Sequence, residues 1–327
     1  MYISVLMSVY NETKKQISES IESILKQSFS DFEFIIINDN PKRDELASIL
    51  SYYKHLDSRI VVLRNEENIG LAMSLNKAAQ FARTDIFARM DADDISEPIR
   101  FELQYKAITE GSFDLVFSNY SIIDEESKQI VFEDNVTCYS PDEIRKLLPY
   151  NSIIHHPTVM MTRDIFYRVG GYRNFPCAQD HDLWLRIWES NGRFLMLNEK
   201  LLKYRMRPNS ISGSNKYKQY LTINYIQELF IQRIKYGVDN YSLENYNSYI
   251  IKNEVDNIKK INELYKYTNK LIKAKNLKHQ GHHIRSTILR IIVFLSSSIF
   301  RKSYIKKIRN KRIINVYNSK ITRSVIK

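Results

Sequence analysis

The chain has 327 residues, of which 43% are hydrophobic and 26% are charged, and this composition excludes an intrinsically disordered protein. The length allows one large domain or two modest ones with a buried core. The two cysteines, Cys138 and Cys177, form neither a metal-ligand pattern nor a disulfide framework, as is typical of proteins in a reducing cytosol.

The positive charge of the chain is concentrated in its C-terminal part. The formal net charge is +12, but residues 264–327 contain 17 Lys and Arg and no Asp or Glu. The first 263 residues carry 32 Lys and Arg against 37 Asp and Glu, so the body of the protein is slightly acidic. Such asymmetry indicates contact with a polyanionic surface, either a membrane or a nucleic acid.

Short apolar runs alternate with helical patterns along the first 120 residues, which predicts a mostly parallel α/β sheet flanked by helices. The first run has no basic segment before it and no small-residue cleavage site after it, so we interpret it as a buried strand and not as a signal peptide. Ligands of such sheets bind at the carboxyl ends of the strands. The predicted strands are residues 3–9, 33–37, 60–63, 86–89 and 115–119.

The simple alternation ends near residue 120, where we expect an insertion that reaches to about residue 150. The chain becomes helical again toward its end, and the domain boundary is expected near residues 215–240. We assign a catalytic domain to residues 1–215 and a helical region to residues 216–327, which is basic from residue 264. The elements expected after residue 120 are a strand at 129–133, a helix after Pro141, a strand and a helix over 157–171, and helices at 180–189 and 215–235.

Three carboxylates, Asp91, Asp93 and Asp94, follow the predicted strand 86–89 directly. Carboxylates at this density repel one another unless they are solvated or hold a cation, and hard oxygen ligands suit Mg²⁺ or Mn²⁺. The alternative is an ordinary acidic turn in which Asp94 or Ser96 caps the next helix. The motif alone leaves both interpretations open.

Two further acidic motifs lie where ligands are expected. Asp39 ends the predicted strand 33–37, where a carboxylate can accept hydrogen bonds from a ribose or a base, or form a helix-capping turn. Asp180 and Asp182 begin the helix at 180–189, where the helix dipole stabilises acids and where a carboxylate can also act as a general base. No glycine-rich G-x-G-x-x-G segment follows the first strand, which argues against a dinucleotide cofactor.

Taken in chain order, these motifs resemble those of the family 2 glycosyltransferases, which have the GT-A fold. Each motif is weak by itself, but the ordered set is specific. The resemblance covers residues 3–214, about two thirds of the chain. The matching segments are 5–12 (VLMSVYNE), 23–29 (SILKQSF), 37–39 (IND), 65–78 (NEENIGLAMSLNKA), 91–94 (DADD), 180–186 (DHDLWLR) and 204–212 (YRMRPNSIS).

The resemblance implies a role for each matching residue. Asp180 is the expected catalytic base, and Asp91 and Asp93 are the expected ligands of Mn²⁺ or Mg²⁺. Tyr10 is expected to stack on the nucleotide base, and Asp39 to bind it. The expected nucleotide-sugar site consists of Ser8, Tyr10, Glu12, Asp39, Asn68, Lys77, Asp91, Arg205 and Arg207, and the expected acceptor site consists of His156, Asp182 and Trp184.

The chain departs from the family pattern at three positions. Asn38 and Gln179 stand where the family commonly has acidic residues, and Arg207 stands where a histidine is frequent, which puts a third protein ligand of the metal in doubt. His155 and His156 favour a structural or acceptor-side loop, because adjacent histidines rarely chelate one ion. Trp184 has two open interpretations, packing in the core or lining the acceptor site.

The implied reaction is an inverting transfer of a hexose or an N-acetylhexosamine from a nucleotide sugar, with UDP expected as the nucleotide. The expected acceptor is a saccharide, lipid-linked, in the synthesis of capsule, O-antigen or lipooligosaccharide. One alternative is a nucleic-acid-binding protein that uses the basic tail, although the acidic body argues against it. The other is a metal-dependent nucleotidyltransferase, which needs a glycine-rich phosphate loop that the sequence lacks.

The basic tail predicts attachment to an anionic membrane surface. Residues 291–300 form an uncharged run, which is shorter than the ~20 residues that a spanning helix needs. We therefore expect the run to lie in the membrane interface and the enzyme to be cytoplasmic, peripheral on the inner face of the membrane. A solvated helical subdomain that packs on protein is the alternative.

Overall fold

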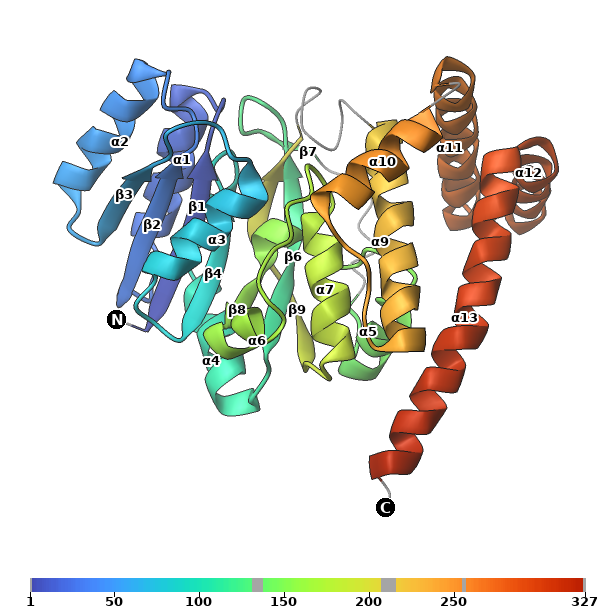
Figure 1. Ribbon diagram of the computed structural model, residues 1–327. Helices are drawn as coiled ribbons and strands as arrows, with labels where there is room; N and C mark the ends of the chain where they lie inside the picture. Colours follow the sequence, from blue (N-terminus) through green and yellow to red (C-terminus); the bar gives the residue numbers. More distant parts are fainter. Residues whose placement is uncertain (1, 131–137, 207–215, 255–256, 326–327) are drawn as a thin grey trace. The chain divides into compact units, whose positions relative to one another are not determined.

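The computed structural model describes residues 2–130, 138–206, 216–254 and 257–325 (Figure 1). The chain divides into two compact units, Met1–Ser214 and Asn215–Lys327. The first unit contains the sheet and its covering helices, and the second contains helices, so the expected α/β class and the expected helical extension are both confirmed.

One mixed sheet organises the first unit, with the strand order β3-β2-β1-β4-β8-β6-β9-β5 and with β7 paired to β6. The first four strands of this order are parallel, as expected, whereas β8 lies antiparallel between β4 and β6. The sheet is therefore less uniformly parallel than the sequence predicts. The strands are β1 (Ile3–Val9), β2 (Phe32–Asn38), β3 (Ile60–Arg64), β4 (Ile86–Asp91), β5 (Ile95–Ser96), β6 (Leu115–Ile123), β7 (Gln129–Ile130), β8 (Met160–Thr162) and β9 (Phe194–Arg205).

Helices lie along the sheet in Figure 1, and the burial of the strands follows from this cover. All seven residues of β2 are buried, because both of its faces meet other elements. Ile17, Ile21 and Ile24 form the buried stripe of α1, whose start is fixed by a capping box between Thr13 and Gln16. The helical elements of this unit are α1 (Lys14–Leu25), α2 (Asp44–Leu56), α3 (Leu71–Phe81), α4 (Arg100–Gly111), α5 (Pro141–Leu147), η1 (His156–Thr158), α6 (Arg163–Arg168) and α7 (Gln179–Glu189).

The parallel strands bring their carboxyl ends to one edge of the sheet. Ser8 is aligned with Asp91 of β4, and Val9 is aligned with Asn38 of β2. Because the side chains after these strands share that edge, the polar motifs found in the sequence become neighbours in space. The predicted strand at 129–133 is present as β7 over Gln129–Ile130, and its other residues lie outside the described part of the chain.

The second unit consists of α-helices in the residues that the structure describes. They are α9 (Lys216–Tyr236), α10 (Leu243–Glu254), α11 (Asn257–His279), α12 (His283–Ser296) and α13 (Ser298–Val325). Among the described residues, no single helix combines the length and the apolar character that a membrane crossing requires. The segments His283–Ser296 and Ser298–Tyr317 meet those criteria only as a pair, across a 95° bend.

Gln27, at the end of α1, joins three elements through one buried amide. Its Nε2 donates to Ser96 Oγ at 3.1 Å and to the Glu97 carbonyl at 2.8 Å, and its Oε1 accepts the Phe101 N–H at 3.0 Å. We predict that Gln27→Leu lowers the free energy of unfolding by ~1–3 kcal/mol, because it leaves buried backbone groups without partners. Urea unfolding measures this, with Gln80→Leu on an exposed position of α3 as the control. Equal stability of the two variants would contradict the role of the amide.

Candidate active site

Three carboxylates gather at the carboxyl end of β4, and we call Asp91, Asp93 and Asp94 the acidic cluster. One ligand oxygen from each lies within 4.8 Å of the others. Asp91 is partly exposed, while Asp94 is completely buried. The next long helix, α4, begins at Arg100 after Ile99, so neither Asp94 nor Ser96 caps it and the capping alternative is wrong.

Asp94 is the member of the acidic cluster that most needs a partner. Its Oδ1 accepts the Arg205 N–H at 2.8 Å, but its Oδ2 is buried without a hydrogen-bond partner among the described residues. Burial raises the pKa of Asp94 well above the usual value, and the charges of Asp91 and Asp93 raise it further. A buried oxygen without a partner, beside two more carboxylates, matches the donor set that Mg²⁺ or Mn²⁺ takes. The residues therefore fit the expected metal, and Asp94 joins Asp91 and Asp93 as a candidate ligand.

Arg89 is a functional candidate that the sequence analysis missed. It lies buried in β4 and forms an ion pair with Asp91, while its Nε has no hydrogen-bond partner among the described residues. Its positive charge also lowers the pKa of Asp180, so Arg89 acts electrostatically on both acidic motifs. A charged residue inside the apolar strand Ile86–Asp91 is the sequence signal that could have identified it.

Asp180 lies in the first turn of α7 and is partly exposed. Burial raises its pKa, the backbone N–H groups of His181 and Asp180 and the charge of Arg89 lower it, and the charge of Asp91 raises it. The net shift is upward. The residue before the helix, Ala178, has a φ of 57° and makes no side-chain cap. A carboxyl group that lies within the field of Asp91 and has a raised pKa is suited to take a proton from a ligand.

The three residues expected at the acceptor site lie in the interior. Asp182 is buried and accepts from Arg186 Nε at 2.9 Å. His156 is buried beside Trp184, whose ring centroid is 6.0 Å away, and its Nε2 is 2.7 Å from the Tyr172 hydroxyl. Burial holds the pKa of His156 well below its usual value. Their burial favours packing in the interior, and for Trp184 it favours the core-packing alternative, while the acceptor roles stay predictions.

Aromatic rings form a second group near the acidic cluster. The His155 ring centroid lies 4.0 Å from that of Tyr120 and 5.4 Å from that of Tyr204. Burial and the charges of the acidic cluster raise the pKa of Tyr204, and burial lowers the pKa of His155 to about 4. His155 is therefore neutral at physiological pH and packs against both tyrosine rings.

Asp39 and Lys77 organise the loop before α3. Asp39 is buried, and its carboxylate accepts from Asn65 Nδ2 at 2.8 Å, from Ile69 N at 2.9 Å and from Gly70 N at 3.0 Å. Lys77 Nζ donates to Asn65 Oδ1 at 2.8 Å. Gly70 has a φ of 82°, a conformation that favours glycine. Hydrogen bonds to Asp39 and Lys77, two residues that were expected to bind the nucleotide, therefore fix the conformation of this loop.

The other residues expected at the nucleotide site surround the end of β1. Tyr10 is 40% exposed, and its backbone N–H donates to Glu12 Oε2 at 2.8 Å. Ser8 is partly exposed beside Asp91, and Asn68 is exposed in the loop before α3, where its Oδ1 accepts the Gly70 N–H. Tyr10 therefore presents its ring to solvent, as a residue that stacks on a base must.

Arg205 is buried and bound to protein on several sides. Its Nε donates to the Asp93 carbonyl at 2.7 Å, its Nη2 donates to Glu19 at 2.7 Å, and its Nη1 donates to the Asp124 carbonyl at 2.9 Å. The guanidinium therefore holds the acidic cluster in place and does not present itself to a diphosphate. Arg207, the second arginine expected there, lies outside the described residues.

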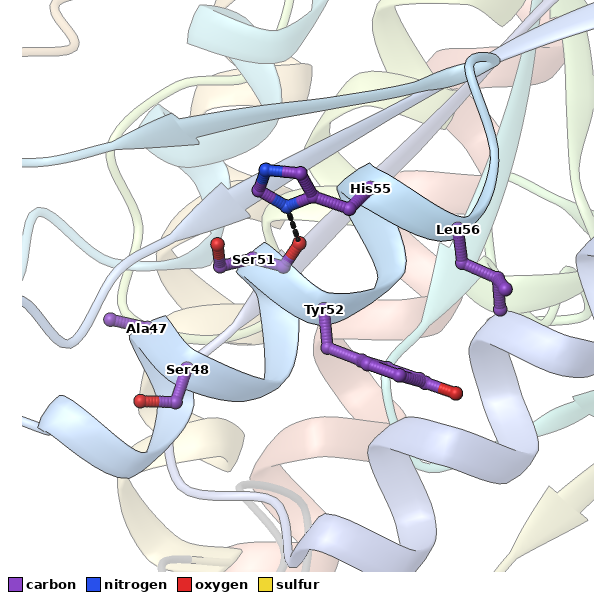
Figure 2. A pocket seen from close by; sticks show the side chains of 6 residues that line it. All are labelled: Ala47, Ser48, Ser51, Tyr52, His55 and Leu56. Carbon is purple, nitrogen blue, oxygen red and sulfur yellow. Dashed lines mark hydrogen bonds between the residues drawn. The ribbon is translucent and has the colours of Figure 1, made fainter.

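A separate shallow hollow lies on α2 and not at the site (Figure 2). Its six lining residues all come from this one helix, and the His55 ring is held by the Ser51 carbonyl at 2.7 Å. The hollow contains no carboxylate and no strand end, so it lacks the groups that the chemistry needs. The lining residues are Ala47, Ser48, Ser51, Tyr52, His55 and Leu56.

Comparison with known proteins agrees with this geometry. The uncharacterized glycosyltransferase MJ1057 of Methanocaldococcus jannaschii is 38% identical over 221 residues, which cover 67% of this chain and 76% of the relative. The O-antigen biosynthesis glycosyltransferase WbnJ of Escherichia coli is 36% identical, with 65% and 82% covered. The UDP-Glc:alpha-D-GlcNAc-diphosphoundecaprenol beta-1,3-glucosyltransferase WfgD of E. coli is 31% identical, with 66% and 81% covered.

Among solved structures, TarS residues 1–349 of S. aureus, crystallised in complex with UDP-GlcNAc, match with a TM-score of 0.59 at 17% identity. The match covers 76% of this chain and 70% of that chain, but only 42% of a longer TarS chain. It confirms the expected GT-A fold. The family model "Glycosyl transferase family 2" matches residues 4–170, about half of the chain, and this chain belongs to that family.

Proposed function

We propose that this protein is an inverting, metal-dependent glycosyltransferase that moves a hexose or an N-acetylhexosamine from a UDP-sugar to a saccharide acceptor. One observation carries the proposal. Three carboxylates gather as a possible metal site, and one of them, Asp91, acts electrostatically on the partly exposed Asp180, while Arg89 pairs with Asp91 and lowers the pKa of Asp180. The family membership and the fold shared with TarS agree with this assignment and argue against a nucleic-acid-binding protein or a nucleotidyltransferase.

The mechanism follows from what each group can do. A Mg²⁺ or Mn²⁺ ion held by Asp91, Asp93 and Asp94 would supply positive charge to the diphosphate leaving group. Tyr10 stacks on the nucleotide base, and Asp39 holds the loop over which the nucleotide lies. Asp180 takes the proton of an acceptor hydroxyl, and the oxygen attacks the anomeric carbon from the side opposite the diphosphate. A single displacement of this kind inverts the configuration at that carbon.

The names of two similar proteins favour UDP and a lipid-linked acceptor. TarS was crystallised with UDP-GlcNAc, and the name of WfgD gives UDP-Glc as donor and a diphosphoundecaprenol saccharide as acceptor. We extend both features to this chain, together with a role in capsule, O-antigen or lipooligosaccharide synthesis. A lipid-linked acceptor also accounts for the basic C-terminal unit, because the enzyme then works as a peripheral protein at the inner face of the cytoplasmic membrane.

We predict that Mn²⁺ or Mg²⁺ raises the melting temperature and that excess chelator abolishes transfer. Asp93→Asn and Asp94→Asn should remove the metal-induced shift, because each takes one anionic ligand from the acidic cluster. Differential scanning fluorimetry with and without Mn²⁺ measures the shift, and Glu110→Gln on the exposed end of α4 is the matched control. Full activity in chelator would exclude the metal.

We predict that UDP together with Mn²⁺ stabilises the protein more than GDP or single-stranded DNA does. A ligand at 100 times its Kd stabilises the native state by about 2.7 kcal/mol through mass action. Tyr10→Ala should weaken UDP binding ~10-fold through lost stacking, while Tyr52→Ala, another exposed tyrosine, should not. Protection by DNA and not by UDP would favour the nucleic-acid alternative.

We predict that Asp180→Asn lowers the transfer rate by at least ~10²-fold and leaves donor binding nearly unchanged, because the amide cannot accept the proton. The matched control is Asp164→Asn on α6, whose carboxylate is exposed and pairs with Arg168. If a folded Asp180→Asn protein turned over normally, another residue would have to be the catalytic base.

The pH dependence gives this variant a second readout. A base works only when deprotonated, so kcat/KM falls as pH drops through the Asp180 pKa, which lies above the ordinary ~3.9 of an aspartate. Arg89→Met removes a positive charge that lowers this pKa, so the acid limb should move to higher pH. An acid limb at the same pH in wild type and in Arg89→Met would contradict the electrostatic link.

A further inference from the structure

Helix α12 packs in the C-terminal unit through a narrow, partly polar face. Ser286 and Val293 are its buried residues, and Ser286 Oγ donates to the Ala274 carbonyl of α11 at 2.6 Å. Leu289 lies between them on the same face and is half-buried. The helix thus contacts its unit through a serine and two aliphatic residues, and most of its apolar side chains lie outside this face.

The opposite face of α12 is an exposed apolar stripe, which we define as Ile284, Ile288, Ile291, Ile292 and Leu295. The spacing of four, three and four residues from Ile284 to Leu295 places them on one side of an α-helix. Ile284, Ile288, Ile291 and Leu295 are 77%, 51%, 52% and 64% exposed. Single exposed apolar residues are normal on solvated helices, whereas a contiguous exposed apolar surface marks an interaction site.

The charges around the apolar stripe identify its partner. Arg285 is exposed beside the stripe, and Arg301 donates from Nη1 to the Leu295 carbonyl at 2.8 Å, which fixes a cation at the stripe's end. The sequence after Glu263 contains 17 cationic side chains and no acidic one. An apolar face bordered by cations matches an anionic lipid surface, whereas a nucleic acid would meet the cations but leave the apolar face uncovered.

The geometry fits a helix that lies in the membrane surface. With 14 residues, α12 is ~21 Å long, shorter than the ~30 Å hydrocarbon core. The chain turns by 95° into α13, whose first turns expose Tyr304, Ile305 and Ile308. α12 is too short to span the bilayer, and an amphipathic helix with cations beside its apolar face rests that face in the boundary between headgroups and acyl chains.

We propose that α12 is an in-plane membrane anchor, which inserts the apolar stripe into an anionic lipid monolayer while Arg285 and Arg301 contact lipid phosphates. This inference does not rest on the glycosyltransferase activity. It explains why the helix turns its aliphatic side chains away from its own unit. Salt can therefore separate two contributions to vesicle binding. The insertion of apolar side chains persists at high salt, whereas the attraction of the cations to the anionic surface is screened.

The test is flotation of the full-length protein with vesicles of phosphatidylglycerol and phosphatidylcholine. The wild type should float at low salt and remain partly bound at high salt. Ile288→Ser/Ile291→Ser/Leu295→Ser should lower the partition into vesicles at least ~10-fold at high salt, because it removes exposed apolar surface that enters the lipid. The matched control is Leu56→Ser/Phe81→Ser/Ile99→Ser, three exposed apolar residues of the catalytic unit, which should bind as the wild type does.

A second variant tests the charges without touching the stripe. Arg285→Gln/Arg301→Gln should reduce binding at low salt and change high-salt binding little, with unchanged helicity by circular dichroism. A wild type that fails to float, or a stripe variant that floats equally well, overturns the proposal. The proposal is also overturned if the stripe holds two copies of the chain together. Sedimentation would then show a dimer that the serine variant abolishes, and the wild type would not bind vesicles.

Discussion

The concentration of negative charge at the end of β4 is the constraint on which the rest of the site depends. Three carboxylates within 4.8 Å of one another repel, and Asp94 is completely buried among them. Arg89 pairs with Asp91 from within the strand, and Arg205 binds the Asp94 carboxylate through its backbone N–H. Two buried arginines thus hold a charge arrangement that would otherwise oppose folding, and they keep it in place for a cation.

Arg205 also shows how the site is assembled from distant parts of the chain. It ends β9, and its guanidinium binds Glu19 of α1 and carbonyl groups of the acidic cluster and of the turn after β6. Its role in this structure is therefore to position other groups, although the family pattern suggested direct contact with a ligand. A guanidinium with five donors in one plane is well suited to join several segments at once.

The fold could be predicted from the sequence because the apolar runs of β1 to β4 and the stripe of α1 are local patterns. The acidic cluster could also be found, because Asp91 and Asp93 follow a strand end. The burial of Asp182 could not, because it lies in the first turn of a helix whose exposed side is decided by tertiary packing. Core packing of Trp184 was one of the two interpretations that the sequence left open. Arg89 was missed although it is a charged residue inside an apolar strand, because its burial and its effect on Asp180 appear only in the folded structure.

The antiparallel strand β8 lies between two halves of the sheet. It pairs with β4 through Ile86, Phe87 and Ala88 on one side, and with β6 on the other. The half before it carries Tyr10, Asp39 and the acidic cluster, and the half after it carries the aromatic group of Tyr120 and Tyr204. Because Arg205 of β9 reaches across this short seam to Asp93 and Asp94, the two halves keep their geometry together, and a segment exchanged with a relative would have to carry β9 along with β4.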